Sequence, residues 1–179
     1  MLDTENDPDV LCALGWGLGH LDLEFPTRCL TRLSGHSDSR VRYGVVGGIL
    51  RNECPEAIAA KILLSKDDDV DVRNWATFGL GTMEMDNDEI RHALAKRLDD
   101  SDCEVRFEAI SGLAKRGDTR VLKCVQELIA QGDFEADAIA LAKFLRDPRL
   151  LPTLQHCTPA DEFESKLLED AIKACESAN

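Results

Sequence analysis

Histidine, cysteine and glycine are the residue types here whose positions could support catalysis, metal binding or nucleotide binding. The four histidines are His20, His36, His92 and His156, and no two of them have the His-x-x-x-His spacing of a helical zinc site. His156 and Cys157 are neighbours on a predicted helix, so their side chains should diverge and not act as base and nucleophile. The Gly-x-Gly run at 15–19 follows no predicted strand, which argues against a nucleotide-binding loop. We expect no enzyme activity, no catalytic residues, no metal and no cofactor.

The cysteines and the start of the chain bear on where the protein resides. The seven cysteines are odd in number and widely spread, and they form no Cys-x-x-Cys pair: Cys12, Cys29, Cys54, Cys103, Cys124, Cys157 and Cys175. The first residues lack the basic and apolar regions of a signal peptide. No stretch approaches the roughly 18 uncharged apolar residues of a membrane span. We expect reduced thiols in a cytoplasmic protein that does not enter a membrane.

Arginine and aspartate recur together at a fixed spacing. Arg42, Arg73 and Arg106 each follow a valine, and an aspartate stands three residues before that valine, at Asp38, Asp69 and Asp102. One interpretation is a stripe of arginines that binds an anion. The other is a structural ladder, in which each arginine pairs with one of these aspartates in its own or the adjacent repeat. We favour the ladder, because the net charge leaves little free positive potential.

The valine belongs to an internal repeat. Four segments share an aspartate, a valine three residues later and a glycine seven residues after the valine, and their valines lie 31, 31 and 33 residues apart: Val10, Val41, Val72 and Val105. Two weaker copies, Asp133-x-x-Ala136 and Glu164-x-x-Leu167, continue the series. Within each unit apolar residues follow the valine at +4, +7 and +8, which is one face of a helix. The aspartate is in position to cap that helix.

A second amphipathic run lies between successive copies, so the repeating unit is a helix, a short aspartate-rich turn and a second helix. Five such runs are expected: 26–33, 55–64, 88–98, 120–129 and 149–154. One hairpin cannot bury its apolar face alone, but stacked hairpins can. The sequence therefore predicts an all-α fold, a right-handed α-α solenoid of about five to six hairpins. It would be a single array over 1–179, with second helices starting near residues 8, 39, 70, 103, 134 and 164.

This pattern resembles the HEAT repeat, and most closely the short bacterial form first noted in phycobilin lyases. A more specific resemblance, to HEAT-repeat proteins encoded beside bacterial Rhs toxin elements, extends from Asp69 to about Cys157. Three strings carry it: 71–78 (DVRNWATF), 104–110 (EVRFEAI) and 150–154 (LLPTL). The resemblance implies a toxin-immunity or accessory protein. The chain would begin with a lone second helix, so we expect a cap or a self-association face there.

Several large side chains fall outside the core positions of the second helices. Tyr43, Asn74 and Phe107 occupy position +2, Trp75 occupies +3 and Phe78 occupies +6. In a solenoid these helices line the concave surface, where exposed aromatic residues are typical interface anchors. Alternatively, Trp75 and Phe78 pack between adjacent helices, with room left by Gly44 and Gly47. Trp75 is the strongest candidate for either role.

The charge balance narrows the class of partner. The chain has 34 acidic against 21 basic residues, a net charge of −13, which disfavours nucleic-acid binding. Acidic residues gather at the predicted turns, as at 67–71, 86–89 and 99–102. They lack the spacing of a calcium loop. They are either solvated helix caps or a docking surface for a basic protein.

The sequence therefore predicts a non-enzymatic protein-interaction scaffold that binds another, basic protein on its concave face. Two alternatives remain open. The phycobilin-lyase resemblance would imply a helper subunit of an enzyme. A DNA glycosylase of the HEAT-like type would need a basic groove, which the acidic composition disfavours.

Overall fold

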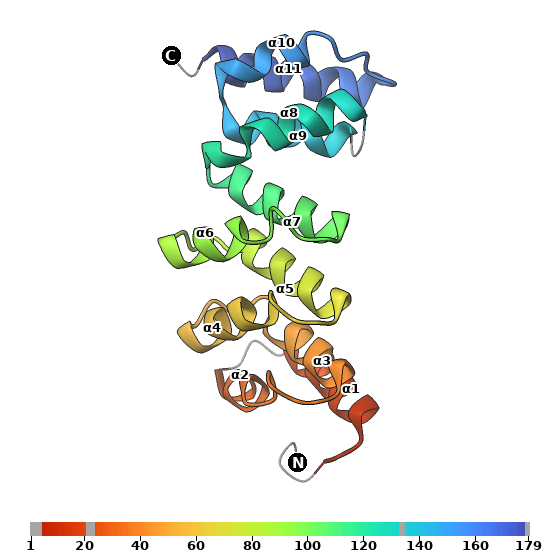
Figure 1. Ribbon diagram of the computed structural model, residues 1–179, viewed down its shortest axis with the longest axis vertical. Coiled ribbons are helices and arrows are strands. Elements are labelled where there is room, and N and C mark those ends of the chain that lie inside the picture. The colour runs from red at the N-terminus through yellow and green to blue at the C-terminus, as the bar shows by residue number, and fades with distance from the viewer. Residues whose placement is uncertain (1–4, 21–23, 133–134, 178–179) are drawn as a thin grey trace. The chain divides into compact units, whose positions relative to one another are not determined.

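The computed structural model describes residues 5–20, 24–132 and 135–177, and within them every regular element is a helix. The chain divides into two compact units, Met1–Ala109 and Ile110–Asn179. Helix pairs repeat along the chain, and the fold is an all-α solenoid (Figure 1).

The first unit contains α1 (Pro8–Gly19), α2 (Glu24–Thr31), α3 (Ser39–Ile49), α4 (Pro55–Leu64), α5 (Val70–Thr82), α6 (Asp88–Ala95) and the first residues of α7 (Cys103–Lys115). Helices α1, α3 and α5 lie side by side, and α2 and α4 pack against them (Figure 1). A buried cluster joins α2, α3, α4 and α5: Leu30, Val45, Val46, Ile49, Ala57, Ala60, Leu64, Val72 and Ala76.

The second unit contains the 3-10 helix η1 (Thr119–Val121), α8 (Leu122–Gln131), α9 (Glu135–Leu145), η2 (Pro148–Leu150), α10 (Leu151–Leu154) and α11 (Glu162–Glu176). Helix α9 packs between α8 and α11, and α10 contacts both α8 and α11. The second helices α1, α3, α5, α7, α9 and α11 begin at residues 8, 39, 70, 103, 135 and 162.

The predicted aspartate caps are confirmed in the four strong repeats. Asp7, Asp38 and Asp69 stand in extended conformation before α1, α3 and α5, and each side chain accepts backbone N–H groups of the first turn. Asp102 does the same for Glu104 and Val105 before α7. A short acceptor at this position satisfies donors that the helix leaves unpaired.

The two weaker copies differ from this. Asp133 lies outside the described residues. The other expected cap, Glu164, is inside α11, and the cap is Asp161, whose carboxylate accepts the backbone N–H of Glu164 at 2.8 Å. The Glu164 carboxylate reaches back to the backbone N–H of Ala160 at 2.7 Å. The arrangement resembles a capping box, except that the glutamate binds the N–H of Ala160, the residue before the cap, and not that of Asp161.

The repeated valine is buried wherever another helix covers it. Val41, Val72 and Val105 are at most 1% exposed, but Val10 in α1 is 42% exposed. Gly48 and Gly79, seven residues after their valines, have side chains of neighbouring helices against them, whereas nothing lies within 4 Å of a Cβ built on Gly17. No helix precedes α1 among the described residues, so this face of α1 lacks the cover that α2 and α4 give to α3 and α5.

Candidate functional site

Four aromatic side chains from α1, α3 and α5 form one cluster in the first unit. The ring centroid of Trp16 lies 5.4 Å from that of Tyr43 and 5.5 Å from that of Trp75. The Tyr43 and Trp75 rings are perpendicular at 6.5 Å, and Phe78 meets Trp75 edge-on at 5.7 Å. Such edge-to-face contacts stabilise the packing of aromatic rings. All four side chains are only partly buried, so the cluster keeps a solvent-facing side.

The cluster joins three of the five predicted binding residues, Tyr43, Trp75 and Phe78. Asn74 lies beside Trp75 on α5, and its Nδ2 donates to the Glu104 carboxylate of α7 at 3.3 Å. Phe107 is partly buried at the corresponding position of α7. The sequence interpretation missed Trp16, although it stands six residues after Val10, as Phe78 does after Val72.

We expected Trp75 and Phe78 of α5 to fill the space beside Gly44 and Gly47, but residues of α1 lie closest to these glycines. A Cβ on Gly44 would meet the backbone of Cys12, and one on Gly47 would meet the ring of Trp16. Gly15 of α1 in turn has the Gly44 backbone against it. These glycines therefore let α1 approach α3 at backbone distance, and this close approach carries Trp16 onto Tyr43 and Trp75. The nearest neighbours of both glycines are therefore in α1, and not the Trp75 and Phe78 side chains that we expected. Trp75 itself packs between neighbouring helices, against Trp16 of α1 and Tyr43 of α3.

The arginine ladder exists, but its carboxylates are not the predicted ones. Arg42 makes a two-pronged contact with Asp67, with both N–O distances at 2.6 Å. Arg73 contacts Asp100 in the same way at 2.9 and 3.2 Å. The aspartates predicted as partners, Asp38, Asp69 and Asp102, cap their helices instead, which turns their oxygens toward the backbone.

Each ladder arginine also joins its own helix to the preceding turn. In each case the arginine Nη1 donates to the backbone carbonyl of the residue six positions earlier. The bonds are Arg42 to His36 at 2.8 Å, Arg73 to Asp67 at 2.7 Å and Arg106 to Asp100 at 2.8 Å. The side chains of Arg73 and Asp100 are only 12% and 5% exposed. The positive charges of Arg42 and Arg73 are therefore committed inside the fold and are not available to bind an anion at the surface.

The contacts of the ladder shift the pKa values of its aspartate and arginine side chains. Burial raises the pKa of Asp100, but hydrogen bonds from Arg73 and from the Asp102 backbone, together with the nearby arginine charges, outweigh burial and lower the pKa overall. The hydrogen bonds that Arg42 donates to Asp67 raise the pKa of Arg42 despite partial burial. In the cluster, burial raises the pKa of Tyr43, and the negative charge of Asp71 adds to that shift.

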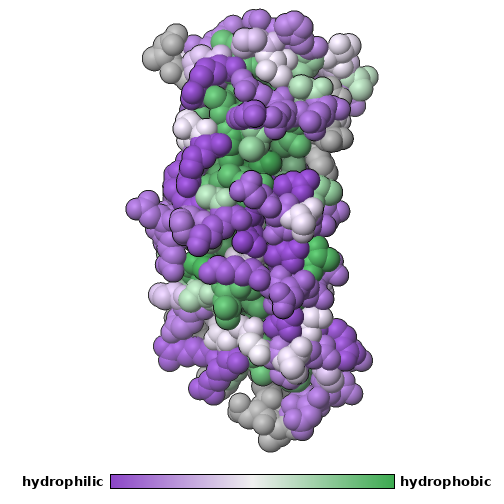
Figure 2. Space-filling view, in the orientation of Figure 1, coloured by the Kyte–Doolittle hydropathy of each residue, from purple (hydrophilic) through white to green (hydrophobic). Residues whose placement is uncertain are grey.

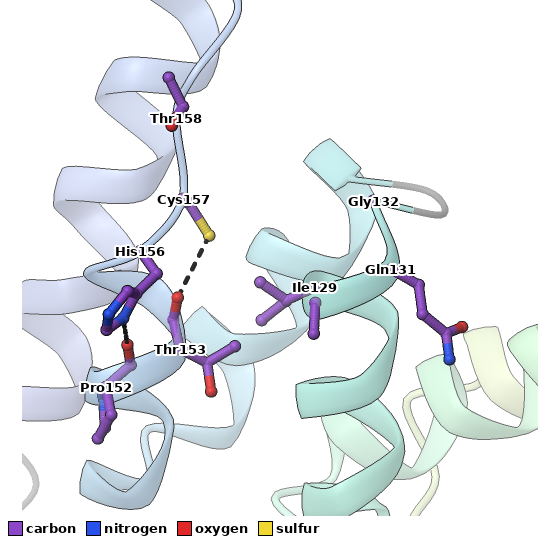
Figure 3. Close-up of a pocket in the computed structure, with 9 residues that line it drawn as sticks. Ile129, Gln131, Gly132, Pro152, Thr153, His156, Cys157 and Thr158 are labelled. Carbon is purple, nitrogen blue, oxygen red and sulfur yellow. Dashed lines mark hydrogen bonds between the residues drawn. The ribbon is translucent and has the colours of Figure 1, made fainter.

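A pocket lies in the second unit, between the end of α8 on one side and α10 with the segment after it on the other (Figure 3). His156 and Cys157 line it from a turn, not from the helix that we expected. The Nδ1 of His156 lies 2.5 Å from the carbonyl of Pro152, and the Cys157 thiol donates to the carbonyl of Thr153 at 3.6 Å. As Figure 3 shows, the two side chains point in different directions, so they do not form a nucleophile and base pair.

The described residues also bear on metal sites and membrane-spanning helices. Within 5–20, 24–132 and 135–177, no group of three or more His, Cys, Asp or Glu side chains is arranged to hold a metal ion. No helix in the same residues is both long and apolar enough to cross a membrane.

The repeat, the capped helix pairs and the arginine ladder define a class of protein. Residues 58–146 match the family model described as HEAT repeats, so this segment is similar to HEAT repeats and lies in an all-α solenoid. Protein YibA of Escherichia coli strain K12 is 42% identical over 93 residues, which cover 52% of this chain and 33% of YibA. YibA of E. coli O157:H7 gives the same values. The match thus spans about a third of the length of these curated relatives.

Solved structures show the same fold. The X-ray structure of E. coli YibA aligns with a TM-score of 0.60 at 22% identity, over 96% of this chain and 83% of that one. The crystal structure of an engineered protein aligns with a TM-score of 0.70 at 18% identity, over 98% and 94% of the two chains. At these identities the likeness concerns the fold alone.

Proposed function

We propose that the protein is a non-enzymatic scaffold that binds another protein on the surface formed by the aromatic cluster of α1, α3 and α5. The observation that carries this proposal is the cluster itself, in which four rings from three successive repeats contact one another and still face solvent. Partly exposed tryptophan and tyrosine side chains that neighbouring contacts hold in place are typical anchors of protein interfaces.

The charge distribution supports a basic partner. The ladder neutralises Arg42 and Arg73 with Asp67 and Asp100, so these arginines do not offset the acidic excess at the surface. The face shown in Figure 2 is largely hydrophilic, with apolar residues in narrower bands. A surface with an excess of carboxylates attracts a basic protein and accelerates its association at low ionic strength.

The finer proposal is an immunity or accessory protein that neutralises a toxin domain by covering it. Its support is the resemblance of residues 69–157 to the HEAT-repeat proteins encoded beside Rhs elements. A toxin that acts on nucleic acid would present a basic active site, which an acidic surface complements.

The test is a calorimetric titration of the purified protein with the toxin domain encoded by the adjacent gene, at low salt and micromolar concentration. We expect a complex whose affinity falls with added salt, and Trp75→Ala should weaken it by about tenfold or more. Phe163→Ala is the matched control, because Phe163 is an aromatic residue of α11 that is 70% exposed. Absence of a complex, or equal loss in both variants, contradicts the proposal.

A further inference from the structure

The solvent-facing side of α5 combines aromatic rings with polar groups along a single stripe. Asp71, Asn74, Trp75 and Phe78 are spaced at i, i+3, i+4 and i+7, so they lie on one face of the helix. Tyr43 of α3 stands beside this stripe, since its ring contacts Trp75 and its ionisation responds to Asp71.

The carboxylate of Asp71 is not used by the fold. Asp71 is exposed in the first turn of α5, and among the described residues no lysine or arginine forms an ion pair with it. Arg40 of α3 stands at the position of the preceding repeat that corresponds to Asp71. Its guanidinium is already paired with Asp38 and Asp9, at N–O distances of 2.7 Å to each. A carboxylate beside aromatic rings is thus free to pair with a cation from outside.

A hydrogen-bond acceptor on the same stripe also lacks a donor. Asn74 gives its Nδ2 to Glu104, and its Oδ1 is covered and has no hydrogen-bond partner within the described part of the chain. Because this oxygen is covered, the stripe offers a partner the carboxylate of Asp71 and the aromatic rings, and not the amide oxygen.

We propose that this stripe receives an arginine side chain of the partner, with the guanidinium stacked on the Tyr43 and Trp75 rings and paired with Asp71. The assignment rests on the proposed function and names the chemistry of the contact. Arginine fits better than lysine because its planar group stacks on aromatic rings and presents two donors to a carboxylate at once. Lysine offers a compact, strongly hydrated charge.

The composition of the chain makes the contact directly observable. The chain has two tryptophans and one tyrosine, and all three are in the aromatic cluster. The indole N–H resonances of Trp16 and Trp75 in a ¹⁵N–¹H spectrum therefore report on this surface, and Trp75→Phe assigns them. The probe is a short peptide of alternating arginine and glycine, compared with peptides that carry lysine or glutamine in place of arginine.

We expect the arginine peptide to shift the Trp75 resonance saturably and to bind about fivefold to tenfold more tightly than the lysine peptide. The variant Asp71→Asn should remove most of that preference. Asp88→Asn is the matched control, because Asp88 is an exposed aspartate in the first turn of α6, away from the stripe. Equal affinity for the two basic peptides, or equal effects of the two variants, overturns the arginine assignment.

The same spectra distinguish a failure of the arginine assignment from a failure of the proposed binding surface. A toxin domain that shifts the tryptophan resonances, when the arginine peptide does not, overturns the arginine assignment and leaves the binding surface in place. A toxin domain that binds without shifting either resonance overturns the binding surface itself.

Discussion

Replacing Arg73 with methionine tests whether the ladder holds the repeats together. Methionine keeps an apolar stem but removes the contact with Asp100, whose side chain is only 5% exposed, and the bond to the Asp67 carbonyl. Breaking a buried ion pair costs about 3–5 kcal/mol. We expect about 3 kcal/mol here, because Arg97 still lies 3.3 Å from Asp100 and the Asp102 N–H still donates to it.

The assay is urea unfolding followed by far-ultraviolet circular dichroism. With a slope of about 2 kcal/mol per molar urea, the midpoint should fall by about 1.5 M. Arg40→Met is the matched control, because Arg40 is 53% exposed and pairs with Asp38 and Asp9 at the surface. Its midpoint should move far less, since exposed pairs contribute little.

The difference between wild type and Arg73→Met should also depend on pH. In the wild type the pKa of Asp100 is lowered, so its contribution to stability is present above the unfolded value near 3.9 and is lost as the pH falls through the folded pKa. In the variant, loss of Arg73 raises the pKa of Asp100 relative to the wild type, so protonation relieves the variant first. The deficit should therefore shrink between pH 7 and pH 3. A deficit equal to that of Arg40→Met, or one that does not change with pH, refutes the reasoning.

Three further predictions concern the first unit. Lys61 is fully buried and donates to the carbonyls of residues 50 and 52, and burial lowers its pKa to about 8. The wild type should thus gain stability relative to Lys61→Met as the pH rises from 7 to 10 in urea titrations, and a constant difference contradicts this. Gly44→Ala should destabilise by about 1–3 kcal/mol through contact with α1, whereas Gly17→Ala should be neutral or stabilising in thermal unfolding; equal effects contradict the close approach. Self-association through α1 stays a prediction: wild type should show a concentration-dependent mass in sedimentation equilibrium that Val10→Glu abolishes, and a constant monomer mass contradicts it.

Local features of the fold could be predicted from the sequence because they depend on neighbouring residues. An aspartate three residues before a buried valine caps a helix, because its side chain accepts the backbone N–H groups of the next residues in the chain. Asp38, Asp69 and Asp102 therefore identify helix starts without tertiary information. The helical period likewise places Val72, Ala76 and Leu80 in the core, where all three are fully buried.

The ladder partners could not be chosen from one repeat, because each lies in the next turn, 25 or 27 residues away. Asp69 and Asp102 are occupied as helix caps. The carboxylates two residues earlier, Asp67 and Asp100, are therefore the ones left to pair with the ladder arginines. The sequence does contain a sign of this pairing, because the arginine and its aspartate are absent together. In the first repeat, Leu11 stands at the position of the ladder arginine. In the next turn, His36 stands at the position that Asp67 and Asp100 occupy in later turns.

The candidate site was only partly predictable for a similar reason. Tyr43, Trp75 and Phe78 stand off the core positions of their own helices, and this much is visible in the sequence. The position of Trp16 depends on how closely α1 approaches α3, which the contacts of Gly15 and Gly44 determine. Close approach of two backbones is a property of the helix pair, so neither helix alone reveals it.

A partner protein that covers the aromatic cluster must change the surroundings of both tryptophans. This is measured most directly by fluorine NMR of the protein labelled with fluorotryptophan, before and after addition of the toxin domain encoded by the adjacent gene. Both tryptophans are in the cluster, so we expect the resonances of Trp16 and Trp75 to shift or broaden together as the complex forms. A complex that forms while both resonances stay unchanged would contradict the claim.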